Sequence, residues 1–445
     1  MIMAENLNTE ADKYALYFPS VQIASAKRIV NADILRNGQA PKKLRGTDFN
    51  YLNPKNPHWY YKYCLVTAEQ YKGKDGNAIS DRDVATFVMG DSGGYQIGTG
   101  AFGDTAQWLQ YQNEPETIMA LWRSSYIREE VLRWQQAQCD IAMTMDMPLW
   151  AMQDWASNSP FHKLTRQQLT ELTVENLQYI SATRRVGSCK LLNVLQGDND
   201  DDEDYWYNAV RHYGFEGWAF AGGVGRRGGI RNSVRMFLRL AEDGLLNPPY
   251  NWVHMLGLSI MTWCPILTQI QMCVREKYNC NFTISFDSSG AYQQAGKFNQ
   301  YFVENTFGAD LDNEWSMSGI DFPSYYTVAN ELVPLPLKKS HAEYEFRAMT
   351  SPIAKKLTLQ DLCVNKSAYA KRIVDDFSDE VLINHNVYTY AKSTVAANQA
   401  VFVTRTAPDK MLAATDVIVE LFNTADWRTL LKDKTKVLEA AARAG

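Results

Sequence analysis

Long apolar segments are missing from this chain. No apolar run reaches the roughly 18 residues that a membrane-spanning helix needs, so no part of it is expected to cross a bilayer. The segment from Met1 to Lys13 is polar and mixed in charge, and it lacks the basic and then apolar layout of a signal peptide. The seven cysteines stand singly and are odd in number, which agrees with a reducing compartment. The sequence therefore predicts a cytoplasmic protein without a membrane partner.

Nucleotide-binding loops are also missing. No G-x-G-x-x-G segment follows an apolar run with an acidic partner about 20 residues further on, so dinucleotide binding has no support. The segment from Gly290 to Lys297 is like a phosphate loop, but its spacing differs and Phe298 stands where a hydroxyl residue would hold magnesium. Internal repeats and low-complexity segments are absent as well. We therefore expect no cofactor.

The remaining composition is that of a globular protein with a large core. Of the 445 residues, 46% are hydrophobic and 21% are charged, and the net charge of −5 argues weakly against nucleic acid as a partner. Charge is nevertheless concentrated locally, and such clusters are often only solvated faces. Acidic residues fill the segment 198–204. Basic residues form one cluster of Lys42, Lys43 and Arg45 and a denser one, around a glycine-rich loop, of Arg226, Arg227, Arg231, Arg235 and Arg239.

The middle of the chain repeats one pattern: a short apolar run, a polar or glycine-rich turn, and a helical stretch. Continuous apolar runs are typical of buried parallel strands, and their alternation with helices predicts βα units. Six runs fit, with room for one or two strands before Asp91 and one after Asp287, so a (β/α)8 barrel fits better than an open dinucleotide-binding sheet. The runs are 85–89 before Asp91, 141–145 before Asp146, 191–195 before Gln196, 217–221 before Gly222, 252–256 before Gly257, and 282–286 before Asp287.

Helices are expected between these runs and in a C-terminal extension. Thr165 and Gln168 have capping-box spacing for a helix over 165–185, and Pro265 suits the first turn of a helix that ends near Lys277. After about residue 340 the composition shifts, and 358–377 and 415–442 are expected to be helical. The sequence thus predicts a barrel over residues 1–340 and an appended, mainly helical region over 341–445.

Two of the strand ends carry similar acidic turns. Asp91-Ser92-Gly93-Gly94 and Asp287-Ser288-Ser289-Gly290 both follow apolar runs, and two strand-end carboxylates in one barrel indicate one active site, although Asp, Ser and Gly are also ordinary turn formers. Gly90-x-Ser92-x-Gly94 also fits the pattern around a hydrolase nucleophile. None of the candidate bases for that serine has a distinctive sequence context: His58, His254, His341 and His385.

The strand-end segments together resemble the motifs of the tRNA-guanine transglycosylase superfamily, in the family's order. The matching segments are 91–96 (DSGGYQ), 140–146 (DIAMTMD), 194–197 (VLQG), 214–219 (GFEGWA) with Gly222 and Gly223, 255–257 (MLG), and 286–287 (FD). The resemblance implies an irregular (β/α)8 barrel that exchanges a guanine base in nucleic acid for a 7-deazaguanine.

The resemblance also implies a role for each residue on a motif. Asp287 matches the nucleophile that attacks C1′ of the target nucleotide, and Asp91 matches the general acid/base; exchange with retention at an anomeric carbon uses such a pair. Asp146 matches the acceptor for the N1 and N2 edge of guanine, while Gln196 and the Gly223 amide match donors to O6. The other base-binding matches are Tyr95, which would stack on the ring, Gly222 and Leu256.

One family feature is missing. Zinc-containing members have a C-x-C-x2-C cluster and a downstream histidine that fix a tRNA-contacting subdomain, whereas here only Cys363 and His385 fall in that region. Two ligands do not make a structural zinc site, so no metal is expected. A zinc-free chain resembles the branch, largely encoded by bacterial viruses, that places 7-deazaguanines in DNA. Val224 stands where the family has Leu, which leaves the 7-substituent open.

We therefore expect a guanine transglycosylase that acts on DNA and imports 7-cyano-7-deazaguanine (preQ0), in the host cytoplasm where a bacteriophage encodes it. Arg226, Arg227 and Arg231 are expected to hold phosphates beside the base pocket. Three alternatives stay open: the same exchange on tRNA, a catalytically silent nucleic-acid-binding relative, and a serine hydrolase that uses Ser92. The oligomeric state does not follow from the sequence.

Overall fold

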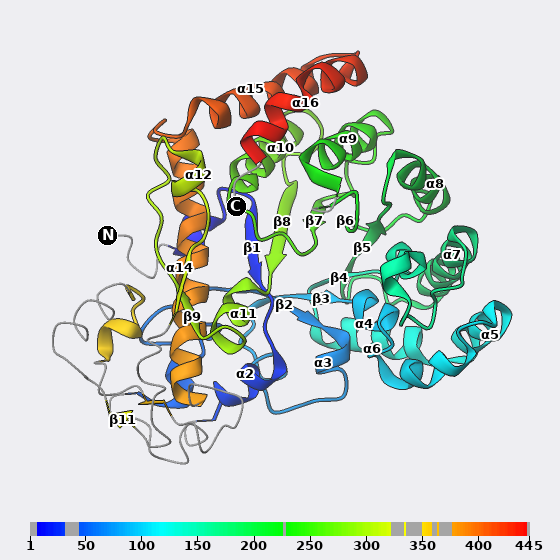
Figure 1. Cartoon of the computed structure of the whole chain (residues 1–445), viewed down its shortest axis with the longest axis horizontal. Coiled ribbons are helices and arrows are strands. Elements are labelled where there is room, and N and C mark those ends of the chain that lie inside the picture. The colour runs from blue at the N-terminus through cyan, green and yellow to red at the C-terminus, as the bar shows by residue number, and fades with distance from the viewer. Residues whose placement is uncertain are drawn as a thin grey trace.

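A computed structural model describes residues 7–31, 44–225, 228–321, 333–334, 349–357, 363–364 and 376–442. Its centre is one parallel sheet of eight strands in the order β1, β8, β7, β6, β5, β4, β3, β2 (Figure 1). The bridge between Ser20 and Leu65 brings β1 beside β2, so the sheet is a nearly closed barrel. The strands are β1 (Leu16–Pro19), β2 (Tyr63–Thr67), β3 (Phe87–Asp91), β4 (Ile141–Met143), β5 (Lys190–Leu195), β6 (Gly217–Phe220), β7 (Trp252–Met255) and β8 (Thr283–Ser288).

The expected (β/α)8 fold is confirmed, with one change at the ends of the barrel. The six apolar runs coincide with β3 to β8 to within two residues at either end. The N-terminal region supplies two further strands, β1 and β2. The room that the sequence left for one barrel strand after Asp287 is not used, because β1 pairs with β8 in parallel and leaves no edge there for another strand.

Helices form the outer layer, and their ends follow local sequence signals. The capping box is present, because the Gln168 backbone N–H donates to Thr165 Oγ1 (3.2 Å) and the Thr165 backbone N–H donates to Gln168 Oε1 (3.0 Å). Pro265 lies in the first turn of α10. The helices up to β8 are α1 (Leu7–Ala11), α2 (Ile23–Arg28), α3 (Ala68–Tyr71), α4 (Gly94–Gly98), α5 (Pro115–Ser124), α6 (Ile127–Gln138), α7 (Arg166–Thr183), α8 (Asp200–Val210), α9 (Gly229–Glu242) and α10 (Trp263–Lys277). Short 3-10 helices are η3 (Gly46–Phe49), η4 (Gly103–Tyr111), η5 (Leu149–Met152) and η6 (Asp154–Ala156).

Side chains fill the interior of the barrel. Phe18 of β1 is fully buried, and its ring lies within 5.0–6.4 Å, centroid to centroid, of four rings from β2, β3 and β7: Tyr63, Phe87, Trp252 and His254. Because side chains alternate along a strand, this aromatic layer occupies the inside of the barrel and leaves the next inward positions for the site. The barrel is therefore a packed core with its chemistry confined to an end.

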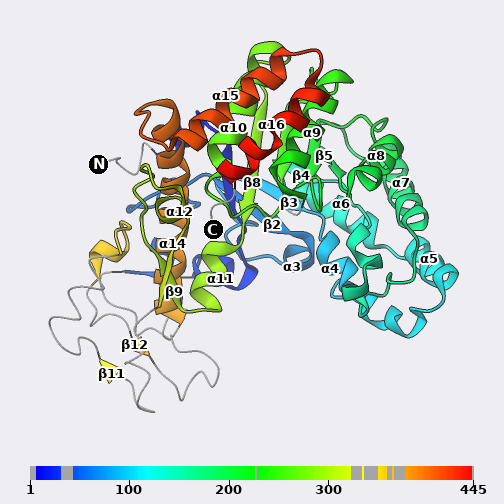
Figure 2. The same cartoon turned by 45° about the horizontal axis from the view of Figure 1, so that its top comes forward.

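The C-terminal helices pack against the barrel. α14 (Asp376–Phe402) lies beside α11 (Gly290–Gly296) and β1, and most of its residues are buried. Arg28 of α2 donates to Glu380 of α14 (2.7 Å) and pairs with Asp379 (3.0 Å). α15 (Asp409–Asn423) covers α10, and α16 (Trp427–Ala442) covers α9 (Figures 1 and 2). The mainly helical C-terminal region thus contributes to the same core as the barrel.

Two helices predicted there have different outcomes. The helix expected over 415–442 is interrupted between Asn423 and Trp427, giving α15 and α16. Of the helix expected over 358–377, residues 376–377 begin α14, Cys363–Val364 form a strand instead, and the rest lies outside the described residues. The remaining elements are α12 (Leu311–Glu314), η9 (Ala354–Lys356), a β9 (Gln300–Phe302) and β10 (Gly319–Asp321) pair, and a β11 (Val333–Pro334) and β12 (Cys363–Val364) pair. Within the described part of the chain, no helix is both long and apolar enough to cross a membrane.

Candidate active site

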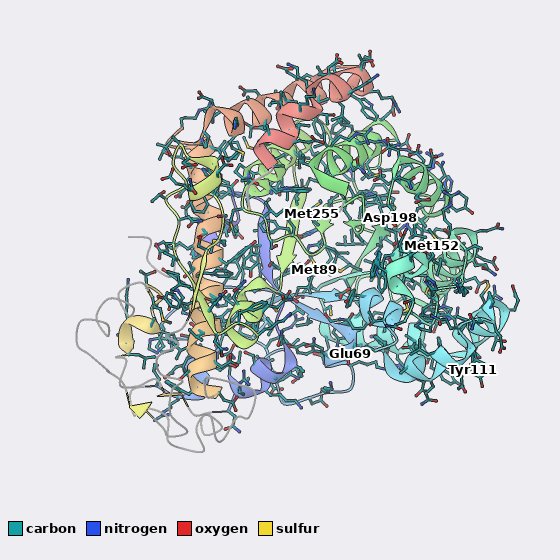
Figure 3. The ribbon with its side chains drawn as sticks, in the orientation of Figure 1. Glu69, Met89, Tyr111, Met152, Asp198 and Met255 are labelled. Atoms are coloured by element: carbon teal, nitrogen blue, oxygen red, sulfur yellow. The ribbon has the colours of Figure 1, made fainter. Side chains whose placement is uncertain are left out.

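The carboxyl ends of the strands bring the predicted site residues to one end of the barrel. Asp91 ends β3 and Asp287 lies in β8, while Asp146 and Gln196 follow β4 and β5. Gly222 and Leu256 follow β6 and β7 in the same way. Met89 and Met255, which precede two of these ends, are labelled near the middle of the barrel in Figure 3. Parallel strands all end on the same face, so the motif residues gather there although they are far apart in the sequence.

The carboxylates of the site are electrostatically coupled. Burial raises the pKa of Asp91 to about 6; the charge of Asp287 adds to this shift, and a hydrogen bond from the Gly93 backbone N–H opposes it. The pKa of Asp146, which is 8% exposed, is also raised to about 7, mainly by burial and in addition by the nearby charge of Asp91. Within the described residues, no lysine or arginine forms an ion pair with Asp91, Asp146 or Asp287. The site is therefore acidic and poised to exchange protons near neutral pH.

Asp287 has two polar contacts that the sequence motifs did not identify. The Gly257 backbone N–H donates to Asp287 Oδ1 (2.7 Å), and His254 Nε2 lies 3.3 Å from the same oxygen. His254 Nδ1 is 2.8 Å from Ser285 Oγ, and the Trp252 indole N–H donates to the same oxygen (2.7 Å). Strand alternation was the available signal: 252 and 254 share one face of β7, and 285 and 287 share one face of β8.

The predicted donors to a guanine O6 are occupied. Gln196 Nε2 donates to Asp146 Oδ2 (2.7 Å) and to the Met147 carbonyl (3.0 Å), while its Oε1 accepts from the Leu149 N–H (2.9 Å). The Gly223 N–H donates to the Gly197 carbonyl (2.5 Å). A Cβ at Gly223 would lie 2.0 Å from that carbonyl oxygen, so the contact requires glycine. A base would have to replace some of these bonds to receive both donors.

Three aromatic rings form a rim beside the acidic site. Tyr95 is the second residue of α4, four residues after Asp91, and it is 65% exposed. Its ring centroid lies 5.5 Å from that of Trp150, whose ring stacks on Trp155 at 5.2 Å and 18°. Trp155 is itself 59% exposed. A Cβ at Gly98 would clash with Trp150 at 2.6 Å, so α4 and η5 fit together only because that residue is glycine. We call Tyr95, Trp150 and Trp155 the aromatic rim.

Of the three arginines predicted to bind phosphates, the structure describes one. Arg226 and Arg227 lie outside the described residues. Arg231, on α9, pairs with Asp200 through both terminal nitrogens (2.5 and 2.9 Å). The geometry thus shows Arg231 bound to a protein carboxylate that a phosphate would have to displace.

Other sequence candidates have less chemical support from their surroundings. Ser92 is only 1% exposed, and the hydrogen bonds of the described histidines do not include it; His341 lies outside the described residues. Burial lowers the pKa of His385 to about 4, and its ring nitrogens lie within hydrogen-bond reach of the Phe302 carbonyl (2.8 Å) and the Ser351 N–H (3.4 Å). No group of three or more potential metal ligands occurs among the described residues.

A cavity of about 440 Å³ opens at the opposite, amino-terminal end of the barrel. Acidic residues on its wall are paired with cations: Asp12 with Lys62 (2.7 Å) and Asp140 with Arg82 (2.9 Å). That neutralisation distinguishes it from the acidic end, where chemistry is expected in such barrels.

Fold and site together define a (β/α)8 barrel with a cluster of carboxylates at the carboxyl ends of its strands. No protein-family model matches the chain, and a search of curated proteins finds no match either.

Proposed function

We propose that this chain is a guanine transglycosylase that replaces guanine in DNA with a 7-deazaguanine, 7-cyano-7-deazaguanine being the favoured one. The observation that carries the proposal is the unlike pair of Asp91 and Asp287. Donors hold Asp287 from one side, whereas burial keeps the pKa of Asp91 at about 6. Two neighbouring carboxyl groups in different environments suit a nucleophile and a separate acid/base.

The proposed reaction is a double displacement. An oxygen of Asp287 forms a bond to C1′ while the bond from C1′ to N9 of guanine breaks. Its electron pair leaves with guanine, and Asp91 supplies the proton that neutralises the leaving base. The incoming 7-deazaguanine then loses its N9 proton to Asp91, its N9 attacks C1′, and Asp287 departs as a carboxylate. The proton taken from Asp91 in the first step is returned in the second.

Recognition of a guanine-like edge is supported by Asp146 and Gln196. Asp146 offers a carboxylate to the N1–H and N2–H donors, and the Gln196 amide is hydrogen-bonded to it at 2.7 Å. When a base enters, its N–H groups would take the place of the Gln196 N–H on Asp146, and that N–H would turn to O6. The bonds seen in the structure thus keep both groups satisfied until a base replaces them.

Nucleic acid as the polymer is supported by the aromatic rim. Exposed rings stack on unpaired bases at about 1–3 kcal/mol per base, and a base must leave its stack to reach Asp287. Tyr95, four residues after the end of β3, and Trp155, which stacks on the neighbouring Trp150, present such exposed rings. The choice of DNA over tRNA rests on the missing zinc motif and on family resemblance.

The decisive experiment compares Asp287→Asn with Ser92→Ala. An amide cannot form the glycosyl ester, so Asp287→Asn should fold but fail both to exchange bases and to form a denaturation-resistant adduct with DNA. Ser92→Ala should keep both properties. Full exchange by the Asn variant would refute the mechanism, and loss of all activity in the Ser92 variant alone would favour the hydrolase. Mass spectrometry of nucleosides from the DNA and the tRNA of expressing cells identifies the polymer and the inserted base.

A further inference from the structure

His254 is a buried histidine in direct contact with the proposed nucleophile. It is 0% exposed, and the strand register sets it opposite Ser285, two residues before Asp287. Its two ring nitrogens face different partners: Nδ1 meets Ser285 Oγ (2.8 Å) and Nε2 meets Asp287 Oδ1 (3.3 Å). The imidazole therefore bridges the interior of the barrel and the reacting carboxylate.

The partner of Ser285 decides which ring nitrogen carries the proton. The Trp252 indole can only donate, so its 2.7 Å bond makes Ser285 Oγ an acceptor. The single hydroxyl proton of Ser285 then points to His254 Nδ1, its other hydrogen-bonding neighbour in the described structure. A neutral imidazole that accepts at Nδ1 carries its proton on Nε2. That N–H is directed at Asp287 Oδ1.

The two oxygens of Asp287 consequently have different surroundings. Both described hydrogen bonds to this carboxylate, from the Gly257 N–H and from His254, end on Oδ1. We propose that Trp252, Ser285 and His254 form a hydrogen-bonded line that fixes the proton of His254 on Nε2, occupies Asp287 Oδ1, and leaves Oδ2 to attack C1′. This inference rests on the proposed function and makes His254 a positioning residue for it.

The arrangement serves both half-reactions. When Oδ2 bonds to C1′, Oδ1 becomes the carbonyl oxygen of the ester and keeps its two donors. When the incoming base displaces Asp287, negative charge returns to the carboxylate, where the same two N–H groups already point. Fixed donors aimed at developing charge need no rearrangement during the reaction, and the loss of one such donor typically lowers kcat by about 10²- to 10³-fold.

A pair of substitutions separates positioning from packing. In His254→Gln the side-chain amide N–H reaches about as far as Nε2, so the donor to Asp287 is kept. In His254→Asn the amide reaches only about as far as Nδ1, so that donor is lost while a polar group remains in the core. We expect the Gln variant to stay within about tenfold of wild-type kcat and the Asn variant to fall by about 10²- to 10³-fold, with KM for the free base unchanged in both.

His385 provides the matched control. It is another fully buried histidine, but it lies on α14 and its Nε2 is 2.8 Å from the Phe302 carbonyl of β9, away from the carboxylates of the site. His385→Gln and His385→Asn should both lower the melting temperature, and their kcat values should not differ from each other. Equal kcat for the two His254 variants would overturn the proposal, as would a loss of activity that follows the melting temperature in all four variants.

The tautomer of His254 can be measured without any activity. Nitrogen-15 NMR of the wild type should show the neutral imidazole of His254 as the Nε2–H tautomer, and Ser285→Ala should change that signal. A proton on Nδ1 instead would refute the proposed line of hydrogen bonds. A wild type that shows the expected tautomer but never exchanges guanine in DNA or tRNA would remove the proposed function and, with it, the nucleophilic role given to Oδ2.

Discussion

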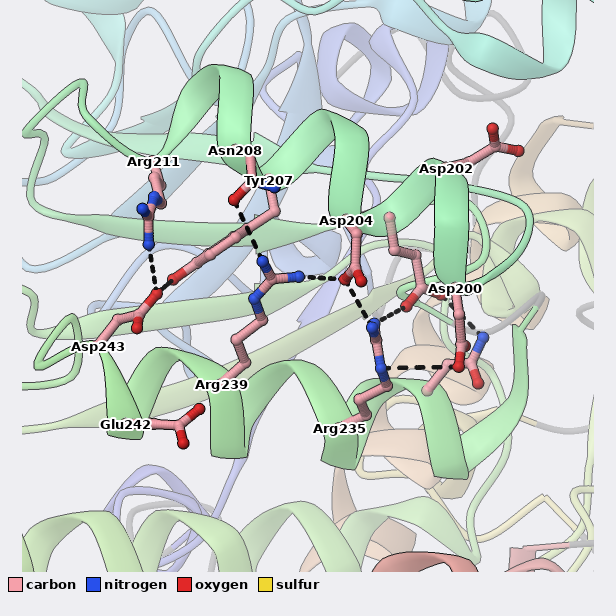
Figure 4. A network of polar contacts seen from close by, with 12 residues as sticks. Asp200, Asp202, Asp204, Tyr207, Asn208, Arg211, Arg235, Arg239, Glu242 and Asp243 are labelled. Carbon is pink, nitrogen blue, oxygen red and sulfur yellow. Dashed lines mark hydrogen bonds and ion pairs between the residues drawn. The ribbon is translucent and has the colours of Figure 1, made fainter. Parts of the chain in front are cut away.

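Two groups of carboxylates in this molecule differ in what surrounds them. Where α8 packs against α9, in a contact that we call the α8–α9 surface, acidic and basic side chains interlock: Asp200, Glu203 and Asp204 with Arg231, Arg235 and Arg239. Figure 4 shows Asp200 and Asp204 with Arg235 and Arg239. At the carboxyl ends of the strands, the described contacts of Asp146 and Asp287 come from an amide, a backbone N–H and an imidazole. The first group is neutralised by arginines, and the second is not.

The difference shows which carboxylates are structural. The hydrogen bond from Arg231 lowers the pKa of Asp200, whereas burial raises the pKa values of Asp91 and Asp146. Burial also raises the pKa of Glu203 to about 7, but Arg235 opposes that shift, so the arginine partners and not the pKa values alone separate the two groups. A buried carboxylate without a cation costs folding free energy and is retained where chemistry needs it. The arginines of the α8–α9 surface therefore join two helices, and the proposed function assigns its chemistry to the carboxylates at the strand ends.

The largest expected effect tests Asp91. Asp91→Asn should lower the rate of base exchange by about 10²- to 10⁴-fold, because it removes the proton donor while leaving the nucleophile in place. In the wild type, single-turnover adduct formation should slow as the pH rises through about 6, where Asp91 loses its proton. The variant should lack this pH dependence. An unaltered pH profile in Asp91→Asn would assign the proton transfer to another group.

The next effect concerns stability. Burial raises the pKa of Asp146 from 3.8 to about 7, so between these values the folded chain holds a proton that the unfolded chain has lost. Below pH 3.8, Asp146 therefore makes its full contribution to the free energy of unfolding, and this contribution is lost as the pH rises through 7. Asp146→Asn should be more stable than wild type at pH 8, by on the order of a few kcal/mol, and this gain should vanish near pH 4. Urea denaturation at both pH values measures the difference in unfolding free energy between variant and wild type. An equal gain at pH 8 and pH 4 would contradict the raised pKa of Asp146.

A third comparison sets the aromatic rim against the arginine surface. Trp155→Ala should weaken DNA binding by about 1–3 kcal/mol, roughly 5- to 150-fold, because it removes a stacking ring. Its salt dependence should stay unchanged, since no phosphate contact is lost. Arg239→Ala should change the affinity little, because Arg239 already pairs with Asp204. Binding isotherms at several salt concentrations measure both variants. A large loss of affinity in Arg239→Ala with little change in Trp155→Ala would place the DNA on the α8–α9 surface instead.

The smallest expected effect concerns Asp200, whose contribution to stability depends on pH in the opposite direction to that of Asp146. The pKa of Asp200 lies below 3.8, so its stabilising contribution is present above that value and is lost as the pH falls through the folded-state pKa. Asp200→Asn should be less stable than wild type at pH 7, by at most about 1 kcal/mol because the pair is partly exposed, and the deficit should fade in acid. If Asp200→Asn were more stable than wild type, the carboxylates paired with arginines would not differ from those of the site in their effect on stability.

The sequence by itself determined the repeating βα units, the order of six strands, and the placement of Asp91, Asp146, Gln196 and Asp287 at strand ends. These follow from apolar runs and turn residues, which are local signals. Capping at Thr165 and the start of α10 are equally local. The role of each residue remains a prediction that comes from resemblance to a family.

Tertiary structure alone decided how the barrel closes and which charged groups are paired. β1 and β2 are short apolar runs like the other strands, but the closure of the barrel depends on β1 pairing with β8, far away in the sequence. The same holds for the arginines: Arg231 meets Asp200 only because α8 and α9 pack together. His254 had no context of its own until strand register placed it between Ser285 and Asp287. Such contacts join residues that are distant in the chain, and patterns within a single segment carry no information about them.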